Sequence, residues 1–209
     1  MTATRPAKKR LRVWWLKQLH TWHWVSAAVS LVAMLLFAVT GITLNHAATI
    51  SAEPRVTGRA ATLPPPLVGQ LAGQHATGAP LPPAVADAVA RVVGLDPGDH
   101  AGEWSDGEVY VALPRPGGDA WVSIDRASGA IEAEVTDRGW ISYLNDLHKG
   151  RNAGTAWFWF IDVFAAACIL FTLTGLLLLH LHARHRPSTW PLVAFGLALP
   201  VLIAAFLIH

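Results

Sequence analysis

The sequence predicts a membrane α-helical protein with three transmembrane helices and a small α+β extracytoplasmic domain between the first and second spans. One observation is a mean hydropathy of +0.37 with only 14% charged residues, which is high for a soluble protein. A second is three apolar segments, each long enough to cross a hydrocarbon core of about 30 Å as a helix. They cover residues 25–44, 157–181 and 190–208. The third is a polar block between the first two segments, large enough for one small domain.

Composition divides the chain into successive segments. A stretch rich in Ala, Pro and Gly, with three consecutive prolines at 64–66, is typical of a linker that leads into a domain. The predicted segments are a basic cytoplasmic tail at 1–10, transmembrane helix 1 at 11–48, a linker at 49–82, a folded periplasmic domain at 83–138, an interfacial helix at 139–154, transmembrane helix 2 at 155–183 and transmembrane helix 3 at 188–209.

The predicted domain contains one helix and three strands. Val85 and Val89 fall on one face at helical spacing, which indicates a helix over 83–93. Alternation of polar and apolar residues predicts strands at 108–113, 120–125 and 130–135, separated by turns at 116–119 and 127–129. One helix against a small antiparallel sheet is the expected arrangement. The following segment, 140–148, is amphipathic and is expected to lie at the outer membrane interface.

Basic residues predict the orientation. The tail before His20 carries six of them and no acidic residue, and Arg184 and Arg186 occupy the short turn between the second and third spans. Both regions should be cytoplasmic, which places the domain in the periplasm and the protein in a bacterial inner membrane. The first apolar run is too long for the core of a signal peptide, so an uncleaved anchor is favoured. Anionic lipid explains the basic tail better than nucleic acid does, and no nucleic-acid partner is expected.

Seven of the ten histidines cluster at two depths in the membrane. The inner set is His20, His23, His180, His182 and His185, and the outer set is His46 and His148. Histidine tolerates the headgroup region, which is one interpretation of any single member. The pattern of all seven together favours metal or haem binding, because neutral imidazole is an axial ligand for haem iron and a ligand for zinc or copper.

A haem needs two ligands from opposing helices at equal depth. His46 with His148 fits an outer site, and His20 or His23 with His180 or His182 fits an inner one. His180 and His182 are about 200° apart around the helix, so only one of them can face a given partner. Because His180 is the deeper of the two, the favoured iron ligands are His23 with His180 and His46 with His148, with His20 and His182 as alternates.

The cofactor expected from these pairs is haem b, in two copies. No Cys-x-x-Cys-His motif occurs, so the haem would not be covalently attached. No residue is expected to act as a catalytic acid or base. His23 and His46 are separated by roughly 35 Å along a straight helix, a long gap for electron transfer. Tilted helices, a homodimer, or intervening aromatic residues would shorten it; the aromatic candidates are Phe37, Phe164 and Phe171.

Asp162 lies about one turn inside the second span. A carboxylate inside a membrane is costly and is therefore a candidate for function. It would either accept a hydrogen bond from a ligand imidazole and orient it, or stand as a shallow residue reached by water. The sequence leaves both interpretations open.

Two stretches resemble the PepSY-associated transmembrane helix family: "LHTWHWVSAAVSLVAMLLFAVTGITLNH" and "LNDLHKGRNAGTAWFWFIDVFAAACILFTLTGLLL". The segment "AWVSIDRASGAIEAEV" is similar to the strand–turn–strand of a PepSY domain, with Asp125 and Gly129 at the turn. The resemblance implies that some larger relatives are inner-membrane haem proteins that reduce ferric siderophores. It also implies that short relatives are partners of flavin-bearing periplasmic proteins and receive electrons from cytoplasmic flavoproteins. It matches the family histidines to His20 or His23, His46 and His148. The chain differs from the larger members in having three spans and one small domain.

The first hypothesis is therefore a transmembrane oxidoreductase of the ferric-reductase type. A b-type haem protein would carry electrons from a cytoplasmic flavoprotein to a periplasmic ferric siderophore or flavin-bearing redox protein. The alternative is a membrane-anchored PepSY module without redox activity, which binds a peptidase or another partner through its sheet edge. A third hypothesis is a copper or iron transport accessory that uses the same histidines.

Overall fold

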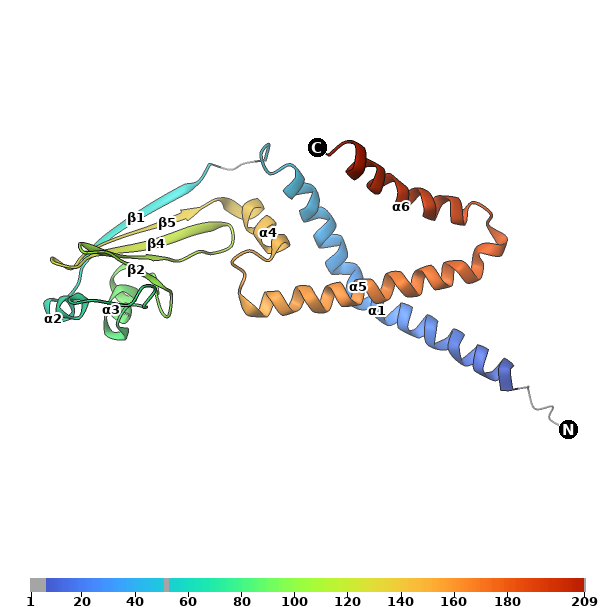
Figure 1. Cartoon of the computed structure of the whole chain (residues 1–209), viewed down its shortest axis with the longest axis horizontal. Helices are drawn as coiled ribbons and strands as arrows, with labels where there is room; N and C mark the ends of the chain where they lie inside the picture. The colour runs from blue at the N-terminus through green and yellow to red at the C-terminus, as the bar shows by residue number, and fades with distance from the viewer. Residues whose placement is uncertain (1–6, 51–52, 209) are drawn as a thin grey trace. The chain divides into compact units, whose positions relative to one another are not determined.

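The computed structural model describes residues 7–50 and 53–208, and Figure 1 shows the order of its helices and strands. The described residues form two compact units, one from residues 7–36 with 160–208 and the other from residues 37–50 with 53–159. Of the predicted tail at 1–10, residues 1–6 lie outside the described part. The predicted boundary at residue 10 is wrong, because residues 7–10 already belong to the first helix.

Within the described residues, three helices are long and apolar enough to cross a membrane. They are α1 (Ala7–Asn45), α5 (Gly154–His182) and α6 (Thr189–Phe206). Leu, Ala, Val and Phe fill them, and their large side chains are mostly exposed, as expected for a surface that contacts lipid. A short 3₁₀ turn, η2 (Ala183–His185), connects α5 to α6. The predicted three spans are thus present as three helices, with the sheet domain between the first two.

Each of the two longest helices has one partly covered stripe. On α1 the stripe contains His23, the fully buried Ser30 and Phe37, seven residues apart. On α5 it contains Phe164, Phe171 and Leu178 at the same spacing, with Thr174 buried beside them. A repeat of seven keeps one face of a helix toward a packing partner.

The domain between the spans contains a five-stranded antiparallel sheet in the order β1-β5-β4-β3-β2. The strands are β1 (Arg55–Thr62), β2 (Gly102–Trp104), β3 (Glu108–Ala112), β4 (Gly118–Asp125) and β5 (Ala130–Asp137). The small α+β character predicted from the sequence is therefore confirmed. The helix α3 (Pro83–Val93) begins on a proline, where its missing N–H costs nothing, and ends at Gly94 in the left-handed conformation.

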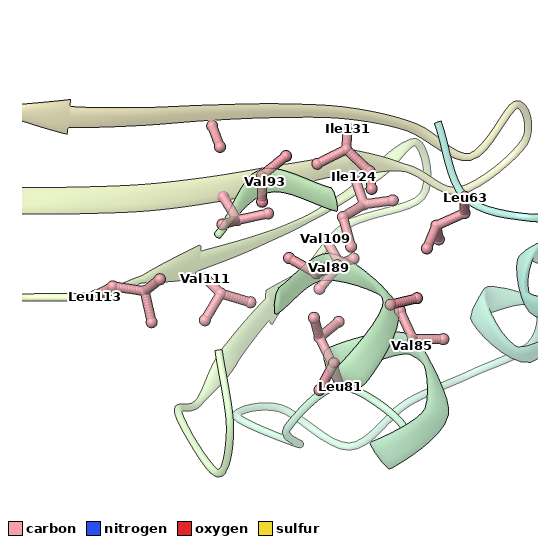
Figure 2. Packing of buried hydrophobic residues seen from close by; sticks show 14 of the residues in the cluster. Leu63, Leu81, Val85, Val89, Val93, Val109, Val111, Leu113, Ile124 and Ile131 are labelled. Carbon is pink, nitrogen blue, oxygen red and sulfur yellow. The ribbon is translucent and has the colours of Figure 1, made fainter. Parts of the chain in front are cut away.

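Figure 2 shows the domain core, in which valines of α3 point toward the sheet. Val85, Val89 and Val93 meet Val109 of β3 and Ile124 of β4, and each of these side chains is 0–2% exposed. Strand alternation brings every second residue of β4 to this face. Burying this apolar surface is the main force that holds the domain together.

The predicted linker at 49–82 is wrong. Residues 55–62 form β1, which pairs with β5 along its whole length, from Arg55 opposite Asp137 to Thr62 opposite Ala130. Two short helical turns follow, α2 (Pro65–Val68) and η1 (Gly69–Leu71). Leu63, Leu71 and Leu81 from this region enter the core at 0–3% exposure. The strand has no alternating apolar pattern because it lies at the sheet edge with nearly all residues exposed. The three-residue β2 is also absent from the prediction.

The predicted interfacial helix at 139–154 corresponds to α4 (Gly139–Lys149). It ends at Gly150, which adopts a left-handed conformation with φ of 67°. Asn152, with φ of 55°, turns the chain again before α5. The helix is thus shorter than predicted, and a tight connection follows it.

The sheet face opposite α3 is acidic around one aromatic pair. Tyr110 and Trp121 stack with ring centroids 5.8 Å apart. Partial burial raises the pKa of the Tyr110 phenol above its ordinary value, and the negative charges of Glu103, Asp119 and Glu134 raise it further.

This environment gives a pH-dependent prediction. The chain has two tyrosines, so a Tyr143→Phe variant reports on Tyr110 alone. We expect its tyrosinate absorbance to rise with a midpoint above the ordinary value of about 10. The folded domain favours the neutral phenol, so this stability contribution is present below that ordinary value and is lost as pH rises through the folded pKa. Adding Glu103→Gln should lower the midpoint, because it removes one of the negative charges that raise the pKa of Tyr110. A midpoint at or below the ordinary value in Tyr143→Phe alone would show that the pKa of Tyr110 is not raised.

Candidate functional site

His23 is held between α1 and α5. Its Nδ1 lies 3.0 Å from the hydroxyl oxygen of Thr174, which is 6% exposed. Its ring stacks on Phe171 with centroids 4.8 Å apart and planes 14° apart. Gly175 makes room for the imidazole, because a Cβ at that position would lie 3.2 Å from Cε1 of His23. A hydroxyl, an aromatic face and a missing side chain therefore fix this ring.

His23 also lines a cavity of about 500 Å³. His182 lines the same cavity, and so do Leu178 and Leu179 of α5. Arg186, beyond the end of α5, supplies a cation at its wall. A cavity of this size is in the range that accommodates cofactors, and an apolar wall with few polar groups is typical of such sites.

His148 of α4 has a similar environment in the other unit. Its Nδ1 lies 2.7 Å from the hydroxyl oxygen of Thr40, which is 4% exposed. Phe37 lies beside the ring at a centroid distance of 5.0 Å. A Cβ on Gly41 would lie 3.5 Å from Cε1 of His148. A threonine, a phenylalanine and a glycine thus surround each of the two partly buried histidines, His23 and His148.

Further hydrogen bonds hold α4 in place. Thr43 donates to Oδ1 of Asn145 at 2.8 Å, three residues along each helix from the Thr40–His148 contact. The indole N–H of Trp157, at the start of α5, donates to the carbonyl of Leu147 at 2.8 Å. Asp146 is 8% exposed and accepts the backbone N–H of Gly117 at 2.9 Å, which ties the β3–β4 hairpin to α4.

The other predicted ligands are exposed. In His20, His46 and His182, Nδ1 lies 2.7–3.0 Å from the carbonyl oxygen four residues earlier on the same helix. His180 packs edge-on against Trp190, with ring centroids 5.6 Å apart. The structure brings His23 together with His182 at one cavity, whereas His180, the favoured partner, faces α6. The side chain of His185 lies outside the described part of the structure.

The predicted outer ligands lie just after the end of α1, in the case of His46, and on α4, in the case of His148. In the described part of the chain, no hydrogen bond or ring contact joins His46 to His148. Nor does a hydrogen bond join Asp162 to a histidine there; this carboxylate is exposed on α5. Within residues 7–50 and 53–208, no group of three or more His, Cys, Asp or Glu side chains is placed to hold a metal ion.

Several site residues were not predicted from the sequence. They are Thr174, Gly175 and Arg186 around His23, and Asn145 and Asp146 on α4, and their contacts are described above. Threonine and glycine adjacent to each other inside an apolar span are a signal for close helix packing, which the paired residues at 174–175 fit. Arg186 was assigned only to the orientation of the chain.

Comparison with known protein families shows to which family the chain belongs. A family model described as PepSY_TM-like matches residues 14–209. The chain belongs to the PepSY_TM-like family. The match covers the three apolar helices and the sheet domain, so this PepSY_TM-like chain is a membrane protein. Searches of the curated proteins and of the solved structures found no match.

The contact between Gly117 and Asp146 in this PepSY_TM-like chain gives a testable prediction. Asp146→Ala leaves the buried Gly117 N–H without its acceptor, which costs about 1–3 kcal/mol. We expect amides at 113–118 in the full-length protein in detergent to exchange with deuterium about 5–150-fold faster.

Asp119→Ala is the matched control for this experiment. It removes an acidic residue of the same hairpin whose ion pair with Arg138 is about two-fifths exposed, with side-chain exposures of 44% and 40%. Exposed pairs contribute little, so exchange in this variant should stay close to the wild type. Unchanged exchange in Asp146→Ala would show that the carboxylate does not hold the hairpin.

Proposed function

We propose that this PepSY_TM-like protein is a b-type haem protein of the bacterial inner membrane that moves electrons from the cytoplasmic side to a periplasmic acceptor. The observation that carries the proposal is the cavity shared by His23 and His182. Two imidazoles from different helices, apolar walls and a cation are the chemical features that suit an iron porphyrin.

The inner cavity fits haem by its donor set. His23 and His182 would supply nitrogen ligands, and Leu178 and Leu179 would cover the apolar macrocycle. Arg186 would pair with a propionate, since guanidinium recognises carboxylates well. We therefore prefer His182 over His180 as the partner of His23, with His20 as the remaining alternate.

For the outer site we keep His148, paired with His46, as the proposed ligands of a second haem. His148 is the stronger member because its ring is already oriented by Thr40 and Phe37. His46 is exposed, and its ring lies on its own helix. In a homodimer, the second copy would offer a further iron ligand to pair with His148.

The haem iron would supply one-electron chemistry, and the protein would bind, orient and insulate it. Phe171 lies against His23 and Phe37 against His148, so aromatic rings extend each site into the membrane span. The proposed donor is a cytoplasmic flavoprotein. The proposed acceptor is a ferric siderophore or a flavin-bearing protein in the periplasm, which makes the chain a ferric reductase-type oxidoreductase.

A visible spectrum tests the proposal. We expect full-length protein, purified in detergent after expression with ample haem, to show a Soret band and sharp α and β bands on reduction. His23→Ala and His148→Ala should each reduce the ratio of haem to protein. His182→Ala should do the same, and His180→Ala should not.

His100→Ala is the control, because this histidine lies in the domain and its ring contacts the carbonyl of Pro97. Its haem content should match the wild type. A wild-type protein with no Soret band would refute the proposed function, and full haem content in His23→Ala would remove the inner ligand.

The edge strand β1 favours a second function, a membrane-anchored PepSY module that binds a protein partner. Its residues are exposed over nearly the whole of Arg55–Thr62, and it is the last strand on its side of the sheet. An extended peptide can add to such an edge through backbone hydrogen bonds.

A charged residue at the edge tests this second function. A Cβ at Gly58 meets nothing within 4 Å, so Gly58→Glu fits without strain and should block strand addition. Gly107→Glu is the matched control, since its surroundings are equally open. Periplasmic proteins that co-purify with the wild type should be lost from Gly58→Glu and kept by Gly107→Glu. Equal recovery from both variants would refute binding through β1.

A further inference from the structure

We infer that Thr174 and Thr40 are positioning residues that hold His23 and His148 in the tautomer with the proton on Nδ1, which leaves the Nε2 lone pair of each ring available to iron. The use of that lone pair by iron rests on the proposed function. The hydrogen bonds that set the tautomer are a property of the chain alone.

The Thr174 hydroxyl determines which partner donates at the inner site. Its oxygen lies 2.7 Å from the carbonyl oxygen of Leu170 and 3.0 Å from that of Phe171. Carbonyl oxygens only accept, so the single hydroxyl proton is directed to the helix backbone. The oxygen then presents its lone pair to His23 at 3.0 Å, and this contact is satisfied when Nδ1 carries the proton.

Thr40 repeats this arrangement at the outer site. Its hydroxyl donates to the carbonyl of Phe37 at 3.2 Å, and its oxygen lies 2.7 Å from Nδ1 of His148. Both threonines are more than nine-tenths buried, where an unsatisfied polar group is costly. Two hydroxyls from different helices therefore direct two rings in the same sense.

The exposed histidines reach the same tautomer by another route. Nδ1 of His20, His46 and His182 contacts a backbone carbonyl of the same helix, which can only accept a hydrogen bond. In the neutral form of each of these rings, the proton is therefore expected on Nδ1 as well. Substitution of a threonine cannot remove those carbonyls, so these three rings are internal references.

A purely structural role is the competing explanation, because hydrogen bonds between helices stabilise membrane proteins by themselves. The two roles differ in what they change. A structural bond affects stability. A bond to the far nitrogen of a metal-binding imidazole also sets its tautomer, ring orientation and basicity, and losing such a partner typically lowers metal affinity about 10–100-fold.

The first experiment reads the tautomer without haem. Full-length haem-free protein with ¹⁵N-labelled histidine is studied in detergent by long-range ¹H–¹⁵N correlation, with His23→Gln and His148→Gln assigning the two signals. We expect Nδ1–H for both in the wild type. Thr174→Val should populate Nε2–H at His23 only, Thr40→Val at His148 only, and the serine variants should keep the wild-type pattern.

The second experiment titrates the same proteins with haem and measures the midpoint potential. Each valine variant should bind haem about 10–100-fold more weakly at its own site and shift that potential, and each serine variant should restore both. Ser30→Ala is the matched control: its hydroxyl is also buried on α1, and it donates to the backbone carbonyl of Ser26. It should change neither the tautomers nor the haem affinity.

The outcomes separate the inference from the proposed function. Wild-type protein that binds no haem refutes the proposed function, whatever the tautomers are. Wild-type protein that binds haem, with valine variants that keep its tautomers or its affinity and potential, overturns the threonine assignment. A serine variant that behaves like valine overturns it too, because the hydroxyl would not be the active group.

Discussion

The structure depends on polar side chains that find partners on helices otherwise built from apolar residues. In hydrocarbon, a polar group without a partner is costly, so a partly buried histidine beside an apolar helix needs a hydrogen-bond partner, and two histidine–threonine pairs meet this need. His23 with Thr174 is one such pair, and His148 with Thr40 is the other. The small residues Gly175 and Gly41 beside the rings let the backbones come close enough for these contacts.

The sheet domain supports His148 through α4. The core under α3 holds the sheet, the β3–β4 hairpin is tied to α4 by Asp146, and α4 carries His148. Gly117 adopts φ of 73° and lies against Tyr143, where any Cβ would come within 2.7 Å of the backbone. The hairpin therefore fits α4 only with glycine at this position, and the position of His148 depends on that fit.

The sequence predicted much of the fold because its strongest signals are periodic. Helix 83–93 and the strands near 109, 122 and 132 have clear apolar patterns. The three spans are recognisable because each is a long, almost uncharged apolar segment. It missed β1, since an exposed edge strand such as Arg55–Thr62 needs no apolar face. At the site it named the histidines and the flanking Phe37 and Phe171. It did not find Thr174 or Asn145, because a partner across two helices is not visible in spacing along one of them. His180 was preferred over His182 only because it lies deeper in the predicted span. In the structure its ring packs against Trp190 of α6.

The connection after α4 has a mechanical consequence. Gly150 and Asn152 both adopt left-handed conformations, and the Trp157 indole clamps the end of α4 to the start of α5. Together these leave α4 little freedom to swivel. Because Asp146 ties the β3–β4 hairpin to the same helix, a displacement of that hairpin would also displace the imidazole of His148. Among the histidines on helices, His148 is the one whose helix is joined to the sheet domain by a side-chain hydrogen bond in the described part of the chain.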